Sequence, residues 1–195
     1  MEWLVALVMG VVTPAVATQN EAAAQFWLNM AQHCGQAYEG RRVIARDDRP
    51  DLLAGNERLI VHFRECSSEL LALPFHIGAV DGSWDRSRTW RYTWQDGKLE
   101  LRHDHRLSSG EPDESNTMYG GLSIGRGTPE QQQFLFTERT AEDGSALGWR
   151  IEIVPGERYT YGTFSGDSGD NWTWRLDFDL SKPLDKLPPA PWGHE

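Results

Sequence analysis

The clearest hydrophobic pattern lies in two neighbouring segments, residues 88–95 and 99–107. Both segments alternate apolar or aromatic residues with polar ones, and Asp96-Gly97 lies between them. A period of two is typical of a β-strand with one buried face, and Asp-Gly is a strong signal for a two-residue turn. The pattern therefore predicts an antiparallel hairpin that turns at Asp96 and Gly97.

The rest of the chain adds one helix and several short strands. Residues 21–32 are rich in alanine and carry Phe26 and Met30 at helical spacing, and Gly35 follows as a helix end. Short apolar or alternating runs predict strands at 58–64, 70–73, 132–137, 149–154, 159–164 and 172–180. One helix and roughly eight to ten short strands favour a mainly β fold, an antiparallel meander barrel with one short N-terminal helix. A two-sheet sandwich is the alternative.

Two details of these strands can be checked against a structure. Pro74 lacks a backbone donor, so it predicts a strand edge, a bulge or a strand start. The chain has nine tryptophans, and five of them are predicted to face inward: Trp90, Trp94, Trp149, Trp172 and Trp174. They could fill a barrel or line a ligand cavity.

The N-terminal residues have the form of a signal peptide. Residues 3–12 are apolar but too short to span a bilayer, and Ala15-Val16-Ala17 has the small-x-small form of a cleavage site. We therefore expect a signal peptide at 1–17, a single domain at 18–195, and a secreted or periplasmic protein without a membrane span after cleavage. Because Glu2 offsets the charge of the amino terminus, an uncleaved anchor or a misassigned start codon is the alternative.

The charge of the chain bears on its partners. The formal net charge is -10, and removing residues 1–17 takes away only Glu2, which leaves -9. Basic residues are interspersed with acidic ones, so no polybasic run overrules the acidic balance. Nucleic acid and anionic membrane surfaces are therefore poor partners, and a small-molecule ligand is expected instead.

Cys34 and Cys66 are the only cysteines. In an exported chain, an even pair without metal-type spacing predicts a disulfide bond. Two free thiols would be expected only if the protein stayed in the cytoplasm.

The end of the predicted hairpin away from the turn carries the candidate ligand-binding residues. The register pairs Arg88 with His105 and Trp90 with His103, and places all four on the inward face. An inward guanidinium beside two imidazoles is costly to desolvate unless these groups are paired or hydrated. We therefore expect this end of the barrel to be open to water or lined with acceptors.

His103 and His105 could also bind a metal ion. They project to the same side of a strand, and His62, His76 or an acidic residue could supply a third ligand. A guanidinium opposite them repels a cation and favours an anionic group. The expectation is therefore no metal and no other cofactor, with the two histidines in structural or ligand-contacting roles.

Two short motifs look like parts of a trypsin-like protease. Residues 31–34, with His33, and residues 166–169, with Ser168, occur in the chain order of that family. His33 follows the predicted cleavage site too closely to leave room for the strands that precede it in such enzymes. We therefore interpret the motifs as a helix end and a polar turn, and assign no catalytic residue.

Other motifs resemble non-enzymatic families. Gly35-x-x-Tyr38-x-Gly40 after a short helix resembles the start of calycin barrels, the superfamily of lipocalins and fatty-acid-binding proteins. The stretch that includes Arg64-Glu65-Cys66, His103-Asp104-His105-Arg106 and Tyr119-Gly120-Gly121 looks like a family of uncharacterised secreted bacterial proteins, over about a third of the chain. This resemblance implies export and carries no known activity.

Taken together, the sequence favours an exported, non-enzymatic barrel. It is expected to bind a small amphipathic or aromatic ligand that carries an anionic group, through Arg88, Trp90, His103 and His105. The alternatives are a metal-dependent or hydrolytic enzyme centred on His103 and His105, and a structural envelope protein with a filled barrel.

Overall fold

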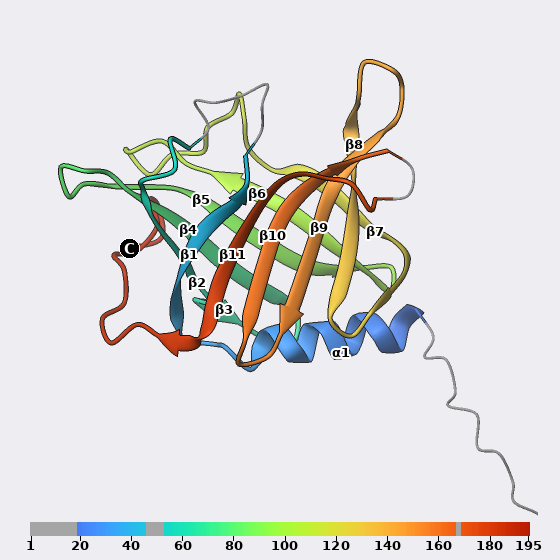
Figure 1. The fold of residues 1–195 in the computed structure, drawn as a ribbon, viewed down its shortest axis with the longest axis horizontal. Coiled ribbons are helices and arrows are strands. Elements are labelled where there is room, and N and C mark those ends of the chain that lie inside the picture. The colour runs from blue at the N-terminus through green and yellow to red at the C-terminus, as the bar shows by residue number, and fades with distance from the viewer. Residues whose placement is uncertain (1–18, 46–52, 167–168) are drawn as a thin grey trace, which may run out of the picture.

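The structure is a computed structural model, and it describes residues 19–45, 53–166 and 169–195. Within these residues one helix, α1 (Gln19–Ala31), precedes eleven strands (Figure 1). The strands are β1 (Ala37–Ile44), β2 (Arg58–His62), β3 (Glu65–Cys66), β4 (Leu70–Gly78), β5 (Trp84–Gln95), β6 (Lys98–His105), β7 (Tyr119–Thr128), β8 (Gln131–Thr140), β9 (Ala146–Val154), β10 (Arg158–Ser165) and β11 (Trp172–Pro183). The signal peptide predicted at residues 1–17 lies outside the described residues.

In the described part of the chain, ten strands close into an antiparallel barrel. From β4 to β11 each strand pairs with the next one in sequence; β11 then pairs with β1, and β1 with β2. The pairing of β2 with β4 closes the ring, and β3 adds a short extension beside β4. The predicted meander barrel with one N-terminal helix is therefore confirmed, and the sandwich alternative is wrong.

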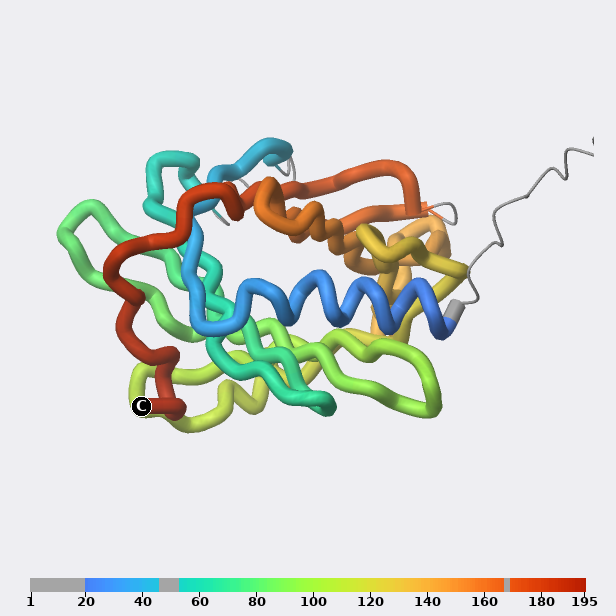
Figure 2. Tube along the Cα trace, turned by 90° about the horizontal axis from the view of Figure 1, so that it is seen from below, coloured from blue at the N-terminus to red at the C-terminus, as the bar shows by residue number. Residues whose placement is uncertain are grey.

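Helix α1 covers one end of the barrel, as Figures 1 and 2 show. Phe26 and Met30 are fully buried, and the Trp27 ring lies 5.6 Å from the ring of Trp94 in β5. The predicted amphipathic face thus packs into the barrel. No helix in the described ranges is long and apolar enough to span a membrane.

The hairpin formed by β5 and β6 has the predicted register. Arg88 lies opposite His105, and the pairing continues without a shift to the turn. Asp96 and Gly97 both have positive φ, 49° and 76°, as a type I′ turn requires. Gly97 lies beside the start of α1, so the opposite end of the hairpin points away from the helix.

Pro74 lies inside β4 rather than at its start. β3 pairs with residues 71–72 of this strand, whereas β2 pairs with residues 75–78. Pro74 therefore lies at the point where the neighbour of β4 on this side changes from β3 to β2. The sheet hydrogen bonds are interrupted at this point, so a residue without a backbone N–H is tolerated there. A register shift against β5 follows between Phe75 and Ile77, which agrees with the predicted bulge.

The prediction that Trp172 faces inward is wrong. Trp174 is buried inside the barrel, whereas Trp172 lies on the outer face between the guanidinium groups of Arg150 and Arg175. A register shift in the pairing of β10 with β11 occurs just beside Thr163, opposite this segment. An extra residue in one strand moves the next side chain to the other face, so strict alternation fails here.

Strand β7 has no counterpart among the predicted strands. Its segment is rich in glycine, which weakens a strand pattern. A Cβ atom on Gly120 would lie 1.9 Å from the carbonyl oxygen of Leu101, and one on Gly121 would lie 2.0 Å from that of Leu135. These glycines let β7 approach its two neighbouring strands closely, because any side chain at these two positions would clash with the backbone of those strands.

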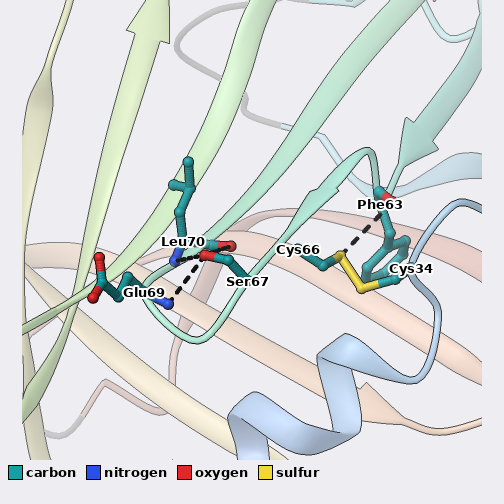
Figure 3. The surroundings of a disulfide bond; sticks show 6 residues. All are labelled: Cys34, Phe63, Cys66, Ser67, Glu69 and Leu70. Carbon is teal, nitrogen blue, oxygen red and sulfur yellow. Dashed lines mark hydrogen bonds between the residues drawn. A yellow bond between two sulfur atoms is a disulfide. The ribbon is translucent and has the colours of Figure 1, made fainter.

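The predicted disulfide between Cys34 and Cys66 is present (Figure 3). It joins the segment after α1 to β3, across a Cα–Cα distance of 6.0 Å. The backbone N–H of Gly35 also donates to the carbonyl of Phe63, at 2.7 Å. The helix is therefore fixed to the barrel at its C-terminal end by a covalent bond as well as by packing.

The last residues, 184–195, cross the outer face of the barrel. His76 contacts the carbonyl oxygen of Pro189 at 2.8 Å, Arg86 donates to that of Ala190, and Arg64 to that of His194. The C-terminal segment is therefore held on the surface of the barrel by specific hydrogen bonds.

Candidate functional site

The barrel interior holds a cavity of about 650 Å³ at the end away from α1. Arg88, Trp90, His103 and His105 all line it. These are the four residues that the hairpin pattern placed on one inward face. The structure therefore brings the predicted set together in a single space, and two of its members, Arg88 and His105, lie at the end of the hairpin farthest from the turn.

An aromatic stack forms the floor of this cavity. The Trp90 ring is nearly parallel to Phe75 from β4, with centroids 5.0 Å apart, and to Tyr161 from β10, at 3.9 Å. Because β5 and β10 lie on different sides of the barrel, the stack crosses the interior. On the helix side of it, Tyr92 and Tyr159 are buried and their hydroxyl groups lie 2.8 Å apart. The barrel is thus filled near the helix and hollow beyond the stack.

His103 has both ring nitrogens engaged. Nδ1 lies 3.1 Å from the carbonyl oxygen of Tyr119, which can only accept, so Nδ1 carries the proton. Nε2 then accepts from the Tyr161 hydroxyl, at 2.6 Å. Burial lowers the pKa of His103 to about 3, since a charged imidazole would be poorly solvated there. His103 is therefore a neutral wall residue at pH 7.

His105 lies closer to the cavity mouth and is held by two groups. Its Nδ1 lies 3.2 Å from the amide nitrogen of Asn116, and its Nε2 lies 3.2 Å from the Tyr119 hydroxyl. Burial and then the charge of Arg88 lower the pKa of His105 to about 4, partly offset by nearby carboxylates such as Asp113. His105 is therefore also neutral at pH 7.

The positive charge of the site comes from arginine. Arg88 forms an ion pair with Asp85 and donates to the Ser87 hydroxyl at 3.1 Å. The expected acceptor for an inward guanidinium is thus supplied by its own strand. Arg139, at the end of β8, also lines the cavity, and its guanidinium carbon lies 5.5 Å from the ring centroid of Phe136.

The cavity lining also includes residues outside the predicted set, among them Tyr119, Arg139 and Tyr161. Tyr161 could have been found, because it shares the alternation of Tyr159 within a predicted strand. Tyr119 begins the glycine-rich β7, and Arg139 lies beyond the predicted end of its strand at residue 137. No sequence pattern indicated whether the side chains of these two residues face the barrel interior.

The metal alternative finds no support in the described residues, where no group of three or more potential ligands lies together. His62 and His76 lie on the outer face of the barrel, where His76 contacts the C-terminal segment, so neither joins His103 and His105.

The protease alternative also lacks a geometric basis. Nδ1 of His33 is hydrogen-bonded to the Tyr38 hydroxyl at 2.7 Å, at the end of the barrel that α1 covers. Gly166 follows β10 at the opposite end, where Ser165 lines the cavity. Ser168 itself lies outside the described residues.

No protein-family model, curated protein or solved structure matches this chain. The family resemblances of the sequence therefore remain predictions, while the barrel itself is shown.

Proposed function

We propose that this protein is an exported barrel that binds a small amphipathic or aromatic ligand, with an anionic group of the ligand near Arg88. The observation that carries the proposal is the cavity of about 650 Å³, which combines aromatic walls with a guanidinium near its mouth. Small-molecule sites in proteins have volumes of roughly 300–1,000 Å³ and are mostly apolar with a few polar groups. The export part of the proposal is based on the pattern of residues 1–17.

The ligand would be held by two kinds of contact. Trp90, Tyr161 and Trp149 offer aromatic surface, which contributes through apolar burial and ring–ring contacts. Arg88 offers a charge-assisted hydrogen bond to an anionic acceptor. His103 contributes its ring surface, because both of its nitrogens are already bonded within the protein.

The hollow half of the barrel favours ligand binding over a purely structural role. A filled barrel would bury its interior side chains against one another, as happens around Tyr92 and Tyr159 on the helix side. Beyond the Trp90 stack the interior side chains instead border free volume. The enzymatic alternative has no comparable observation in its favour.

The proposal can be tested with 8-anilinonaphthalene-1-sulfonate, an aromatic anion whose fluorescence rises in apolar sites. The purified protein should bind about one equivalent, and Leu147→Trp, which places an indole in the cavity, should abolish this binding. Val80→Trp is the matched control, since Val80 is 91% exposed in a turn and its variant should bind as before.

A second pair of variants tests the charge. Arg88→Ala should weaken binding roughly tenfold, whereas Arg91→Ala, on the same strand but not in the cavity, should leave it unchanged. Equal binding by the wild type and Leu147→Trp would show that the cavity is not the site and would reject the proposal. Native mass spectrometry of the purified protein would show whether a molecule is retained.

A further inference from the structure

The Tyr119 hydroxyl lies at the point of the cavity where its polar groups converge. Tyr119 is half-buried, and its ring stacks on His103 with centroids 4.6 Å apart and an angle of 5° between the planes. The hydroxyl contacts His105 at 3.2 Å. The guanidinium groups of Arg88 and Arg139 both lie near enough to oppose the rise that burial causes in the pKa of Tyr119.

The hydrogen-bond pattern leaves the proton of this hydroxyl available. The amide nitrogen of Asn116 can only donate, so Nδ1 of His105 accepts and Nε2 of His105 carries the proton. Nε2–H then donates to the oxygen of Tyr119. The O–H of Tyr119 is therefore free to donate to a ligand, in a region where two guanidinium groups favour an anion.

One guanidinium of the cavity has no carboxylate partner. Arg88 is already paired with Asp85, whereas Arg139 has no ion pair with any carboxylate in residues 19–45, 53–166 and 169–195. The charge of Asp113 opposes the lowering of the pKa of His105, and its side chain accepts from the Ser115 hydroxyl rather than from an arginine. Arg139 is therefore the guanidinium that can pair with an anionic group of a ligand.

The floor of the cavity is aromatic. Phe75, Trp90 and Tyr161 form it, and the Tyr161 hydroxyl already donates to Nε2 of His103. The hydroxyl groups of Thr163 and Thr173, which also line the cavity, lie 2.8 Å apart and are hydrogen-bonded to each other. The inner end of a ligand should therefore be apolar, because it meets aromatic rings and hydroxyl groups that already have partners.

The floor also favours an aromatic ring over an aliphatic chain. Phe75 and Tyr161 both stack nearly parallel to the Trp90 ring, and Trp149, Phe136 and Phe164 also line the cavity. Offset-stacked and edge-to-face aromatic pairs contribute more than their buried area alone. A planar aromatic group can make such ring–ring contacts with these walls, whereas a saturated ring offers only dispersion.

We propose that the ligand is a planar aromatic monocarboxylate, with its carboxylate bound by Tyr119, Arg139 and Arg88 and its rings against the Trp90 stack. This inference rests on the proposed function and adds the chemical class of the ligand and two binding residues, Tyr119 and Arg139.

The test uses four probes of similar size. They are 2-naphthoate, its neutral amide, the saturated decahydronaphthalene carboxylate, and the dianion 2-naphthyl phosphate, each titrated by calorimetry at pH 7.5. Naphthoate should bind at least about tenfold more tightly than each of the other three. The amide lacks the charge for charge-assisted hydrogen bonds, the saturated acid lacks the ring–ring contacts, and the second charge of the phosphate has no further unpaired guanidinium to meet. An equal or higher affinity for the amide, for the phosphate or for the saturated acid would overturn the assigned class.

Variants then assign the residues. Tyr119→Phe keeps the ring on His103 and should lower naphthoate affinity roughly tenfold, while amide affinity stays unchanged. Arg139→Ala should have the same selective effect, and Arg126→Ala, an exposed arginine outside the cavity, should have none. Wild-type affinity for naphthoate in both Tyr119→Phe and Arg139→Ala would overturn the assignment. If no probe binds, 8-anilinonaphthalene-1-sulfonate included, the proposed function itself fails; if that dye binds in the cavity without preference for a carboxylate, only this inference fails.

Discussion

His103 should make the stability of the barrel depend strongly on pH. Burial lowers its pKa to about 3 in the folded protein, whereas an exposed histidine in the unfolded chain titrates near 6.5. The folded state therefore binds fewer protons than the unfolded state between these two values. It follows that the contribution of His103 to stability is complete above pH 6.5, falls as the pH falls, and is lost below pH 3.

The size of the effect follows from the two pKa values. At about 1.4 kcal/mol per pKa unit, the full contribution is roughly 4–5 kcal/mol, and roughly 3 kcal/mol of it is lost by pH 4. The free energy of unfolding of a single domain is about 5–15 kcal/mol, so a loss of this size is a large part of the total stability. The lowered pKa values of His62 and His105, each to about 4, act in the same direction.

The perturbation that isolates His103 is its replacement by glutamine. The amide of His103→Gln can donate to the Tyr119 carbonyl and accept from the Tyr161 hydroxyl, but it does not titrate. At pH 7.5 the free energy of unfolding of the variant should be about 1–2 kcal/mol lower than that of the wild type, because the ring contacts are lost. When the pH is lowered from 7.5 to 4, however, the free energy of unfolding of the variant should fall by roughly 3 kcal/mol less than that of the wild type.

The assay is urea unfolding followed by tryptophan fluorescence at pH 7.5, 6, 5 and 4, with the disulfide intact. The other buried histidines are present in both proteins, so their effects cancel in the difference. Parallel curves of unfolding free energy against pH for the two proteins would refute the reasoning, because a buried neutral His103 must contribute a pH-dependent difference.

Three further changes probe the fold. Gly97→Val should destabilise the protein by about 1–3 kcal/mol, since valine resists the positive φ of this position, and an unchanged denaturation midpoint would place the turn elsewhere. Replacing Cys34 and Cys66 by serine should cost about 3–4 kcal/mol, given their separation of 32 residues, and two thiols titrated in the unfolded, unreduced wild type would contradict the bond. Gly120→Ala should cost about 3 kcal/mol or more, because its methyl group would meet the Leu101 carbonyl, and an unchanged Tm would show that β7 does not approach β6 so closely.

The predictions from sequence succeeded where local chemistry decides the outcome. The strict alternation around Asp96-Gly97 gave the register of the β5–β6 hairpin, because both the turn type and the buried face are specified by adjacent residues. The same alternation placed Arg88 and His105 on the inward face of the hairpin, and in the structure both residues line the cavity. The single pair of cysteines without metal-type spacing, taken together with the predicted export, led to the prediction of the disulfide.

What the tertiary structure decided depends on contacts between distant segments. Trp172 left the predicted face because a register shift against β10 displaced it, and such a shift cannot be seen within one strand. Tyr119 and Arg139 reached the cavity through a glycine-rich strand and an extended strand end, where no alternation was available. The cavity itself exists because the stack of Trp90 and Tyr161 crosses a closed barrel, and closure is a property of all the strands together. The sequence by itself thus determined the fold class, the hairpin and the disulfide, whereas only the closed barrel decided how much of the interior is hollow and which polar groups meet there.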